Sequence, residues 1–453
     1  MDCIPEDKPS AQCSERCSAI VQTLATELLR EIFLNCLPNP SVYRYSMRNL
    51  SQAPLLIGRV CRRWRDVANY SPELWSSFVV GGAKVNLGKD LEATKYWISK
   101  SSSQPLSIVM DYLETYSDDT ELRPILESVV SQSWRWREID LRVPSGFFDI
   151  ALAAFCTGKL PQLVRFDSIT SGPGYREFIL SSAPRLHSMR YSGDRARVDF
   201  SGGTHGIRRI EINPSQYSKI SLGDLLTCFT QCPLLESATL PIHIGEWKSS
   251  LSDRLPTTIQ LPRLTYLFLD FGSNINPCRI FDLLFLPALI SLKLTVHIRN
   301  VDHADWTHVW TMLAHSDPPL RTLVLRCVPM TEQTLLECLS CIPSLTKLQV
   351  EGILCSDNVL RTLTMDETNG NAPKSLCPWL ETFDFWYNRD KCHFSEGAVT
   401  EMVVSRRKTA KSTDYKKGMA LKVFACPFSF SGLRVHPDIA ECINEGLVLM
   451  GSD

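Results

Sequence analysis

The sequence predicts an α/β protein: a helical segment near the N-terminus, followed by a long solenoid in which outer helices cover a curved parallel sheet. Two patterns indicate this fold. Apolar residues have helical spacing between Leu24 and Trp75, and a pattern of apolar residues suited to short strands recurs from residue 134 onward. Of the 453 residues 44% are hydrophobic and 21% charged, as in ordinary globular proteins with a large core.

The first predicted helix has one apolar stripe. Apolar residues recur at every fourth position, and two more stand beside them: Leu24, Leu28, Ile32 and Cys36, with Leu29 and Phe33. This spacing places them on one side of a helix of about a dozen residues. Pro38 and Pro40 then end the helix.

A second helix is predicted from Pro54, which suits a first helical turn. Its apolar residues again fall on one face: Leu56, Ile57, Val60, Cys61, Trp64, Val67 and Ala68. Arginines between them form a basic, solvated face: Arg59, Arg62, Arg63 and Arg65. Two short helices cannot bury both stripes against each other. Part of this apolar surface therefore either caps the next domain or docks a partner.

These residues resemble the F-box motif, in the form seen in fungal F-box proteins of the basidiomycete type. The resemblance is carried by LATELL at 24–29, Ile32 and Phe33, VCRRWR at 60–65 and SPELW at 71–75. Two features depart from the family pattern: Ala25 stands where proline is usual, and the segment from Pro38 to Gln52 is an insertion.

The resemblance implies that this segment binds a Skp-type adaptor protein, and through it the cullin of a Skp–cullin–F-box ubiquitin ligase. Carried over by position, the adaptor-binding residues are Leu24, Leu28, Ile32, Phe33, Val60, Cys61 and Trp64.

The repeat is counted from a zero position, usually proline, with apolar residues at +2, +5 and +7. Zero positions fall at 134, 161, 184, 205, 233, 262, 287, 318, 343 and 378. Their spacing averages about 27 residues, within the range of leucine-rich repeats, and the +5 and +7 residues form the core side of a short strand. Ser168 interrupts the second copy. The spacing varies, so we expect an irregular, gently curved solenoid.

Helices are expected between the strands, at 222–232, 280–286, 304–315 and 331–341. The chain is expected to close with a helix at 395–406, a basic loop, a strand at 420–425 and a helix near 437–450. The predicted domains are a flexible tail at 1–20, the F-box at 21–75 and the solenoid with its capping segment at 76–453. The basic cluster Arg406–Lys417 is interpreted as a solvated loop, with a nuclear-import signal or an acidic partner as alternatives.

Strand positions +4, +6 and +8 are expected to point away from the helices, on the concave side. The predicted target-binding residues among them are Arg165, Arg190, Arg209, Tyr266, Phe268, Lys293, Arg326, Lys347 and Trp386. Exposed aromatic and arginine side chains commonly dominate interface energies. The alternative is that loops or the C-terminal segment cover the aromatic residues.

No motif for catalysis, for phosphate binding or for a cofactor is found, so no catalytic residue, cofactor or metal-ligand set is predicted. Cys338 and Cys341 are interpreted as core thiols. Most of the 17 cysteines stand in apolar runs, which favours a reduced protein of the cytoplasm or nucleus. A net charge of −1 and the lack of a long apolar run argue against nucleic-acid and membrane partners.

The expected function is that of a substrate-recognition subunit of the ligase, with an unknown protein as the target of the solenoid. The alternative is an F-box scaffold or a leucine-rich-repeat interaction module that acts outside a ubiquitin ligase.

Overall fold

The structure, a computed structural model, describes residues 23–37, 47–82, 85–113, 120–156, 160–171, 176–193, 196–213, 220–245, 257–273, 275–297, 305–365, 376–385, 391–411, 420–427 and 431–451. The chain forms two compact units, one of residues 1–163 with 168–170, the other of 164–167 with 171–453. These units do not follow the expected boundary between residues 75 and 76. The predicted tail at 1–20 and Trp386 lie outside the described residues.

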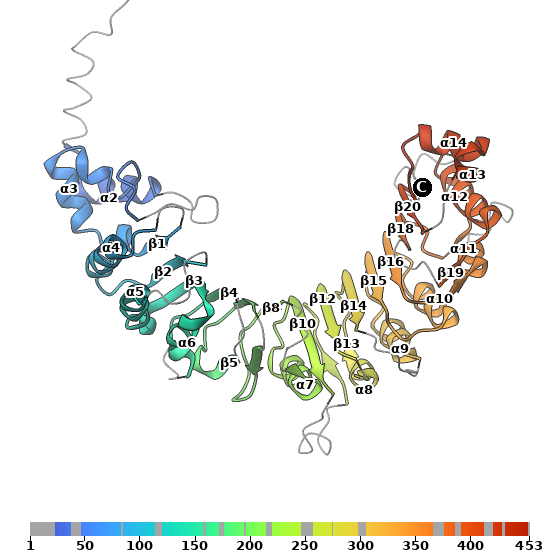
Figure 1. The fold of residues 1–453 in the computed structure, drawn as a ribbon, viewed down its shortest axis with the longest axis horizontal. Coiled ribbons are helices and arrows are strands. Elements are labelled where there is room, and N and C mark those ends of the chain that lie inside the picture. The colour runs from blue at the N-terminus through green and yellow to red at the C-terminus, as the bar shows by residue number, and fades with distance from the viewer. Residues whose placement is uncertain are drawn as a thin grey trace, which may run out of the picture. The chain divides into compact units, whose positions relative to one another are not determined.

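The first unit combines helices with three parallel strands, and Figure 1 shows it in blue to green. Its helices are α2 (Thr26–Asn35), α3 (Arg62–Asn69), α4 (Leu87–Lys100), α5 (Leu122–Val130) and α6 (Phe148–Cys156). Its 3-10 turns are η1 (Ile57–Arg59), η2 (Pro72–Trp75), η3 (Ser133–Arg135) and η4 (Ser145–Phe147). Its strands are β1 (Ser77–Gly81), β2 (Leu106–Asp111) and β3 (Trp136–Pro144), paired in that order.

The second predicted helix is interrupted at Cys61. This residue has extended backbone angles and caps α3, and its sulfur accepts a hydrogen bond from the backbone N–H of Trp64 at 3.4 Å. The residues before it form only the short turn η1. The single helix expected from Pro54 is therefore two elements.

The end of the predicted insertion packs against the first strand. Met47 is buried, and its N–H donates a hydrogen bond to the Val79 carbonyl of β1 at 3.0 Å. Arg48 forms an ion pair with the buried Asp90 of α4 at 2.8 Å, and the Tyr112 hydroxyl donates to the same carboxylate at 3.0 Å. Burial raises the pKa of Tyr112, with a further contribution from the neighbouring Asp90. These contacts attach the segment between α2 and η1 to β1 and α4.

The second unit is built around one parallel sheet. Its strands follow in the order β6 (Ser188–Ser192), β8 (Arg209–Ile212), β10 (Ser237–Ile244), β12 (Tyr266–Phe271), β14 (Ser291–Val296), β15 (Thr322–Arg326), β16 (Lys347–Glu351), β18 (Thr382–Asp384), β20 (Val423–Ala425) and β21 (Val448–Met450). The strand β4 (Arg165–Ser171) contains residues of both units.

The predicted repeat is confirmed as the pattern of the core. All residues at +2, +5 and +7 of the ten copies are at most 2% exposed, including Ser168, whose hydroxyl donates to the Leu141 carbonyl. Neighbouring strands pair so that equivalent positions face each other: Leu240, Leu269, Leu294, Leu325 and Val350 form one continuous row. The α/β class with a large parallel sheet is thus correctly predicted.

Helices lie along one side of this sheet in Figure 1. They are α7 (Leu222–Gln231), α8 (Cys278–Phe281), α9 (Thr307–Ser316), α10 (Glu332–Ser340), α11 (Asp357–Leu363), α12 (Glu396–Lys411), α13 (Ser431–Val435) and α14 (Pro437–Asn444), with the 3-10 turn η5 (Leu180–Ser182). The segment expected as a helix at 280–286 contains only the end of α8, followed by a short strand.

Short parallel strands form three small sheets beside the main one, and one more pairs with β10. The small sheets are β5 (Arg176–Ile179) with β7 (Ala196–Asp199), β11 (Ile259–Gln260) with β13 (Leu284–Phe285), and β17 (Cys355–Ser356) with β19 (Cys392–His393). The strand β9 (Ile220–Ser221) pairs with β10. Most are two residues long, too short to produce a periodic signal in the sequence.

The C-terminal segment departs from the prediction at two points. The final helix α14 ends at Asn444, and Val448–Met450 form the strand β21, which extends the parallel sheet beside β20. The helix α12 continues to Lys411, so the basic cluster begins inside a helix and not in a loop.

Arg406 and Arg407, the first residues of that cluster, are buried. Arg406 donates hydrogen bonds of 2.8–3.0 Å to the carbonyls of Leu363, Leu376 and Cys377. Arg407 donates to the carbonyls of Leu421 and Glu445. The interpretation of these two arginines as part of a solvated loop or an import signal is therefore wrong. Their hydrogen bonds connect α12 to the segments before and after it in the chain. Residues 412–417 of the cluster lie outside the described residues.

Within the part of the chain that the structure describes, no helix has the length and apolarity needed to cross a membrane.

The stacked core predicts a large effect of truncating one repeat leucine. Leu294→Ala should lower the free energy of unfolding by about 2–5 kcal/mol, because the side chain is fully buried between two strands that also place leucine there. Thr295→Ala, on the next and half-exposed position, should change it by about 0.5 kcal/mol or less. Urea denaturation of the full chain measures both, and equal midpoints for the two variants would contradict the assignment.

Arg406→Lys should also destabilise the protein, although it keeps the charge. Burial lowers the pKa of Arg406 to about 10, so the side chain stays protonated at neutral pH. A lysine ammonium cannot reproduce the planar fork that reaches three carbonyls, and each carbonyl left without a donor costs roughly 1–3 kcal/mol. Lys408→Met, at an exposed position of the same helix, is the control. Similar melting temperatures for both variants would refute a structural role of Arg406.

Candidate functional site

The helix α2 separates its apolar residues into a buried and an exposed set. Leu29 and Phe33 are fully buried, whereas Leu28 is 54% and Ile32 is 44% exposed. At 100° per residue Leu28 and Ile32 lie almost on one line along the helix, and Leu29 and Phe33 lie on an adjacent line turned toward the unit. Two of the predicted adaptor-binding residues are therefore available to a partner.

The segment before α3 adds a second exposed apolar pair. Leu56 is 46% and Val60 is 56% exposed, and Cys61 is exposed as well. Leu24 is half-buried, and its carbonyl accepts a hydrogen bond from the Arg63 guanidinium, which ties the start of α2 to α3. Val60 and Cys61 are thus accessible from solvent.

Phe33 was placed among the adaptor contacts, and the structure contradicts this. Its side chain is fully buried within its own unit and packs on the indole of Trp64, with ring centroids 5.0 Å apart. The reason is its position on the inner line of α2, where η2 and α3 also pack. Trp64 is half-buried, so only part of its ring can contact a partner.

The exposed apolar residues stand next to basic ones. Arg59 and Arg62 are exposed, and Arg65 is held by a hydrogen bond of 2.8 Å from its Nε to the Gly58 carbonyl. Glu27 and Glu31 of α2 are exposed as well, so charged side chains of both signs surround the apolar residues, as at the rim of a protein interface. We call Leu28, Ile32, Leu56 and Val60 the exposed strip.

The outward side of the sheet in the second unit forms two in-register rows. One runs through Ser188, Arg209, Ser237, Tyr266, Ser291, Thr322, Lys347 and Thr382. The other runs through Arg190, Glu211, Thr239, Phe268, Lys293, Val324, Gln349 and Asp384. We call these two rows the strand face.

Most predicted target-binding residues lie on or beside the strand face with accessible side chains. Arg165, Arg190, Arg209, Arg326 and Lys347 are exposed, and Tyr266, Phe268 and Lys293 are half-buried. Several of the cations are paired with acids: Arg190 with Glu211 on the next strand at 3.2 Å, Arg326 with Glu351 at 3.9 Å, and Arg165 with Asp167 on its own strand. The face is therefore charge-balanced at these positions.

The centre of the strand face is aromatic. The Lys293 ammonium lies over the Tyr266 ring, 5.3 Å from its centroid, and Phe268 stands opposite Lys293 in the register. The neighbouring Val324 is almost fully buried, which leaves these three side chains as the accessible part of the centre. Such a cation–aromatic group is a typical anchor for protein recognition.

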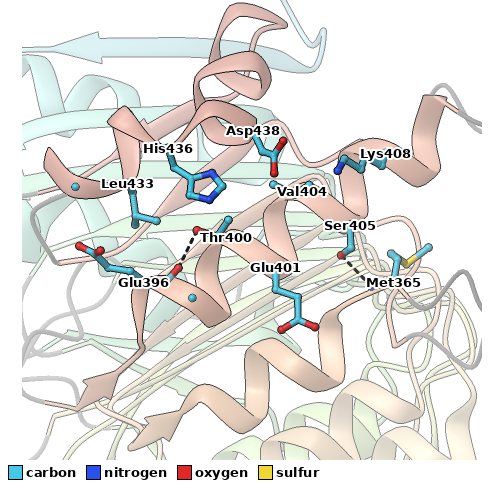
Figure 2. A pocket seen from close by; sticks show the side chains of 12 residues that line it. Met365, Glu396, Thr400, Glu401, Val404, Ser405, Lys408, Leu433, His436 and Asp438 are labelled. Atoms are coloured by element: carbon cyan, nitrogen blue, oxygen red, sulfur yellow. Dashed lines mark hydrogen bonds between the residues drawn. The ribbon is translucent and has the colours of Figure 1, made fainter.

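A surface pocket of about 690 Å³ lies among the C-terminal helices (Figure 2). The pocket is lined by Met365 and by residues of α12, α13 and α14. Its titratable side chains are Glu396, Glu401, Lys408, His436 and Asp438. The polar groups at its wall serve the fold in part: the Thr400 hydroxyl donates to the Glu396 carbonyl, and the Met365 N–H donates to the Ser405 hydroxyl. Nothing in this arrangement indicates a specific ligand.

Neither the pair Cys338 and Cys341 nor the histidines of α9 belong to a metal-ligand cluster among the described residues. Cys338 is buried, and burial raises the pKa of its thiol, as expected for a core residue. The His308 ring bonds to Asp282 at 2.7 Å, and the His315 ring bonds to the Leu284 carbonyl at 2.6 Å. Each histidine thus has a separate partner in the preceding repeat.

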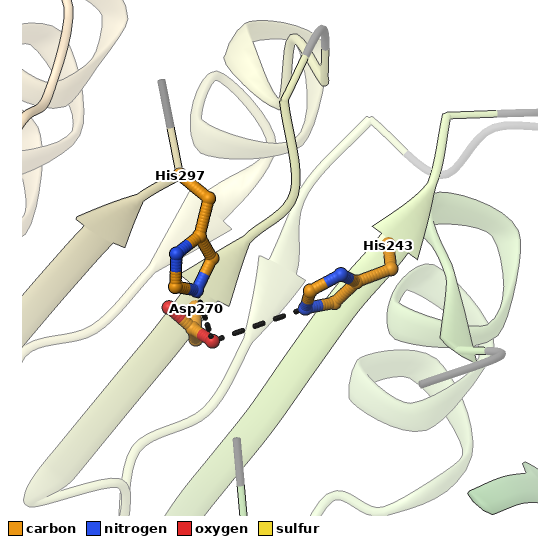
Figure 3. Close-up of side chains that lie close together, drawn as sticks. All are labelled: His243, Asp270 and His297. Atoms are coloured by element: carbon orange, nitrogen blue, oxygen red, sulfur yellow. Dashed lines mark hydrogen bonds and ion pairs between the residues drawn. The ribbon is translucent and has the colours of Figure 1, made fainter. Parts of the chain in front are cut away.

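Three residues that the sequence analysis did not select do converge. His243, Asp270 and His297 come from three neighbouring strand ends and place their donor atoms within 4.8 Å of one another (Figure 3). In the sequence they are 27 residues apart, and only the strand register brings them together. Their positions at +10, +8 and +10 of successive repeats are the one sequence signal that relates them.

Comparison with protein-family models and with curated protein sequences gives no match.

Proposed function

We propose that this protein is the substrate-recognition subunit of a Skp–cullin–F-box ubiquitin ligase. The exposed strip of the first unit binds a Skp-type adaptor, which connects the chain to the cullin, and the strand face of the second unit binds a target protein. The chain itself performs no chemistry in this role. It raises the local concentration of a target lysine near the charged conjugating enzyme.

The division of α2 into two sets of apolar residues is the observation that supports the adaptor role most. A helix that served only to cap the next domain would bury its apolar residues, yet Leu28 and Ile32 stay about half exposed beside buried Leu29 and Phe33. Exposed apolar residues at i and i+4 are typical of helices that dock in a partner groove. The resemblance of residues 24–75 to the F-box motif suggests that this partner is a Skp-type adaptor.

The target-binding role is supported by the strand face. It offers an aromatic and cationic centre at Tyr266, Phe268 and Lys293, with charged side chains of both signs around it. A surface of this kind suits a protein more than a nucleic acid, because its arginines are largely balanced by neighbouring carboxylates.

Ile32→Arg should weaken adaptor binding strongly without unfolding the chain. The substitution places a charge where an apolar contact is proposed, and it should weaken the complex by about 2 kcal/mol or more, which is about thirtyfold in Kd. Calorimetric titration of the purified full chain with the adaptor measures this change.

Thr26→Arg is the matched control for that experiment. Thr26 is exposed on the same helix but on a different side, so its variant should bind the adaptor like the unsubstituted chain. Equal adaptor affinity of Ile32→Arg and Thr26→Arg would exclude the proposed contact. If the adaptor binds but added cullin does not join the complex, the chain acts outside a ligase.

Phe268→Arg should separate target binding from adaptor binding. The variant should keep full affinity for the adaptor and lose the proteins that co-purify through the strand face, because it replaces the central aromatic ring. Quantitative mass spectrometry of proteins bound to the full chain, to Phe268→Arg and to Ile32→Arg provides the comparison. The proposal fails if Phe268→Arg retains the same bound proteins as the full chain.

A further inference from the structure

Three consecutive strands place imidazole and carboxylate groups at one point of the strand face. The N–H of Gly272 donates to the Ile242 carbonyl, and the N–H of His297 donates to the Phe271 carbonyl, both at 2.8 Å. These two bonds continue the parallel ladder past the ends of β12 and β14, so that His243 of β10, Gly272 and His297 form one row. Asp270 lies two residues before Gly272 and therefore points to the same side.

Gly272 allows the two histidines to approach across the middle strand. A Cβ atom at this position would come within 3.2 Å of His243 Nδ1 and 3.3 Å of His243 Cα. With no side chain there, the imidazole rings have centroids 5.8 Å apart. The two rings thus face each other across Gly272, with the Asp270 carboxylate beside them.

The donor atoms point at one another. His297 Nε2 lies 3.1 Å and His243 Nε2 lies 3.9 Å from Asp270 Oδ2, and Figure 3 shows both rings turned toward this oxygen. The Asp270 carboxylate is 97% buried and the His243 side chain is 90% buried. His243 Nε2 is itself buried and has no hydrogen-bond partner. A buried nitrogen and a buried carboxylate are costly unless a further group satisfies them.

We propose that His243, Asp270 and His297 bind a divalent transition-metal ion, Zn²⁺ being the best match. Zn²⁺ bonds imidazole nitrogen and carboxylate oxygen at about 2.0–2.2 Å, which puts two donors of a tetrahedral site about 3.3 Å apart. The His297–Asp270 distance meets this value already, the His243–Asp270 distance exceeds it by about 0.6 Å, and all three donor atoms lie within 4.8 Å of one another. The ion uses the unsatisfied His243 nitrogen and neutralises the buried carboxylate.

The donor set excludes the common hard cations. Ca²⁺ and Mg²⁺ take oxygen ligands, whereas two imidazoles and one carboxylate suit zinc and neighbouring transition metals. Three protein ligands leave a fourth position of the tetrahedron open. His297 is 54% exposed, so the three residues can be reached from solvent on its side. The inference rests on the second unit alone and does not require the adaptor role.

Metal binding by the full-length chain tests the proposal directly. The chain is stripped of metal with a chelator, kept reduced with a phosphine, and titrated with Zn²⁺ by calorimetry. His297→Ala should lose one binding equivalent or bind at least about tenfold more weakly, and its half-exposed side chain contributes little to the core. His308→Ala, which removes a histidine that pairs with a single aspartate, should bind like the unsubstituted chain.

Cobalt spectroscopy separates this site from the cysteines. The chain has 17 thiols that could take metal ions, and thiolate ligation gives Co²⁺ a strong near-ultraviolet charge-transfer band. The unsubstituted chain should show the visible absorption bands of bound Co²⁺ without the thiolate charge-transfer band. His297→Ala and Asp270→Asn should lose these visible bands. Identical zinc affinity and stoichiometry in all variants, or a thiolate spectrum that His297→Ala leaves unchanged, would overturn the assignment.

Discussion

The parallel hydrogen bonding between successive strands, always in the same register, is the constraint on which the second unit depends. Each strand is short, and none could bury a core alone. Pairing in phase sets the leucine at +5 of one repeat against the apolar residue at +5 of the next, as in the rows through Leu267, Leu292, Leu323 and Leu348. The variation in repeat length is taken up between the strands, and so it does not disturb these rows.

The same register also fixes what appears on the outward side. Residues that are 20 to 30 positions apart in the chain become direct neighbours, as Arg190 and Glu211 do in their ion pair. The central group of Tyr266, Phe268 and Lys293 arises in this way, and so does the group of His243, Asp270 and His297. A surface of this kind is assembled from isolated polar and aromatic residues whose sequence neighbours are buried leucines.

The sequence was sufficient for the core but not for the polar contacts. Apolar residues at three fixed offsets identify a strand because the alternation of buried and exposed side chains can be read from one short stretch of sequence. Leu235, Ala238 and Leu240, for example, are all buried. Arg406 could not be recognised as buried, because its three carbonyl partners come from segments about 30 to 43 residues away. The break at Cys61 was missed because the apolar spacing continues through it, although the backbone does not. The group of His243, Asp270 and His297 can be found only when three repeats are aligned and compared at positions after +7, where the apolar pattern has ended.

The buried and the exposed apolar residues of α2 are under different structural constraints. Leu29 and Phe33 are tied to the packing of the first unit, so few residues can replace them. Leu28 and Ile32 have about half of their surface in solvent, so their replacement by other apolar residues should have little effect on folding. Changes among apolar residues at these two positions would therefore alter the surface that the first unit presents while its packing stays intact.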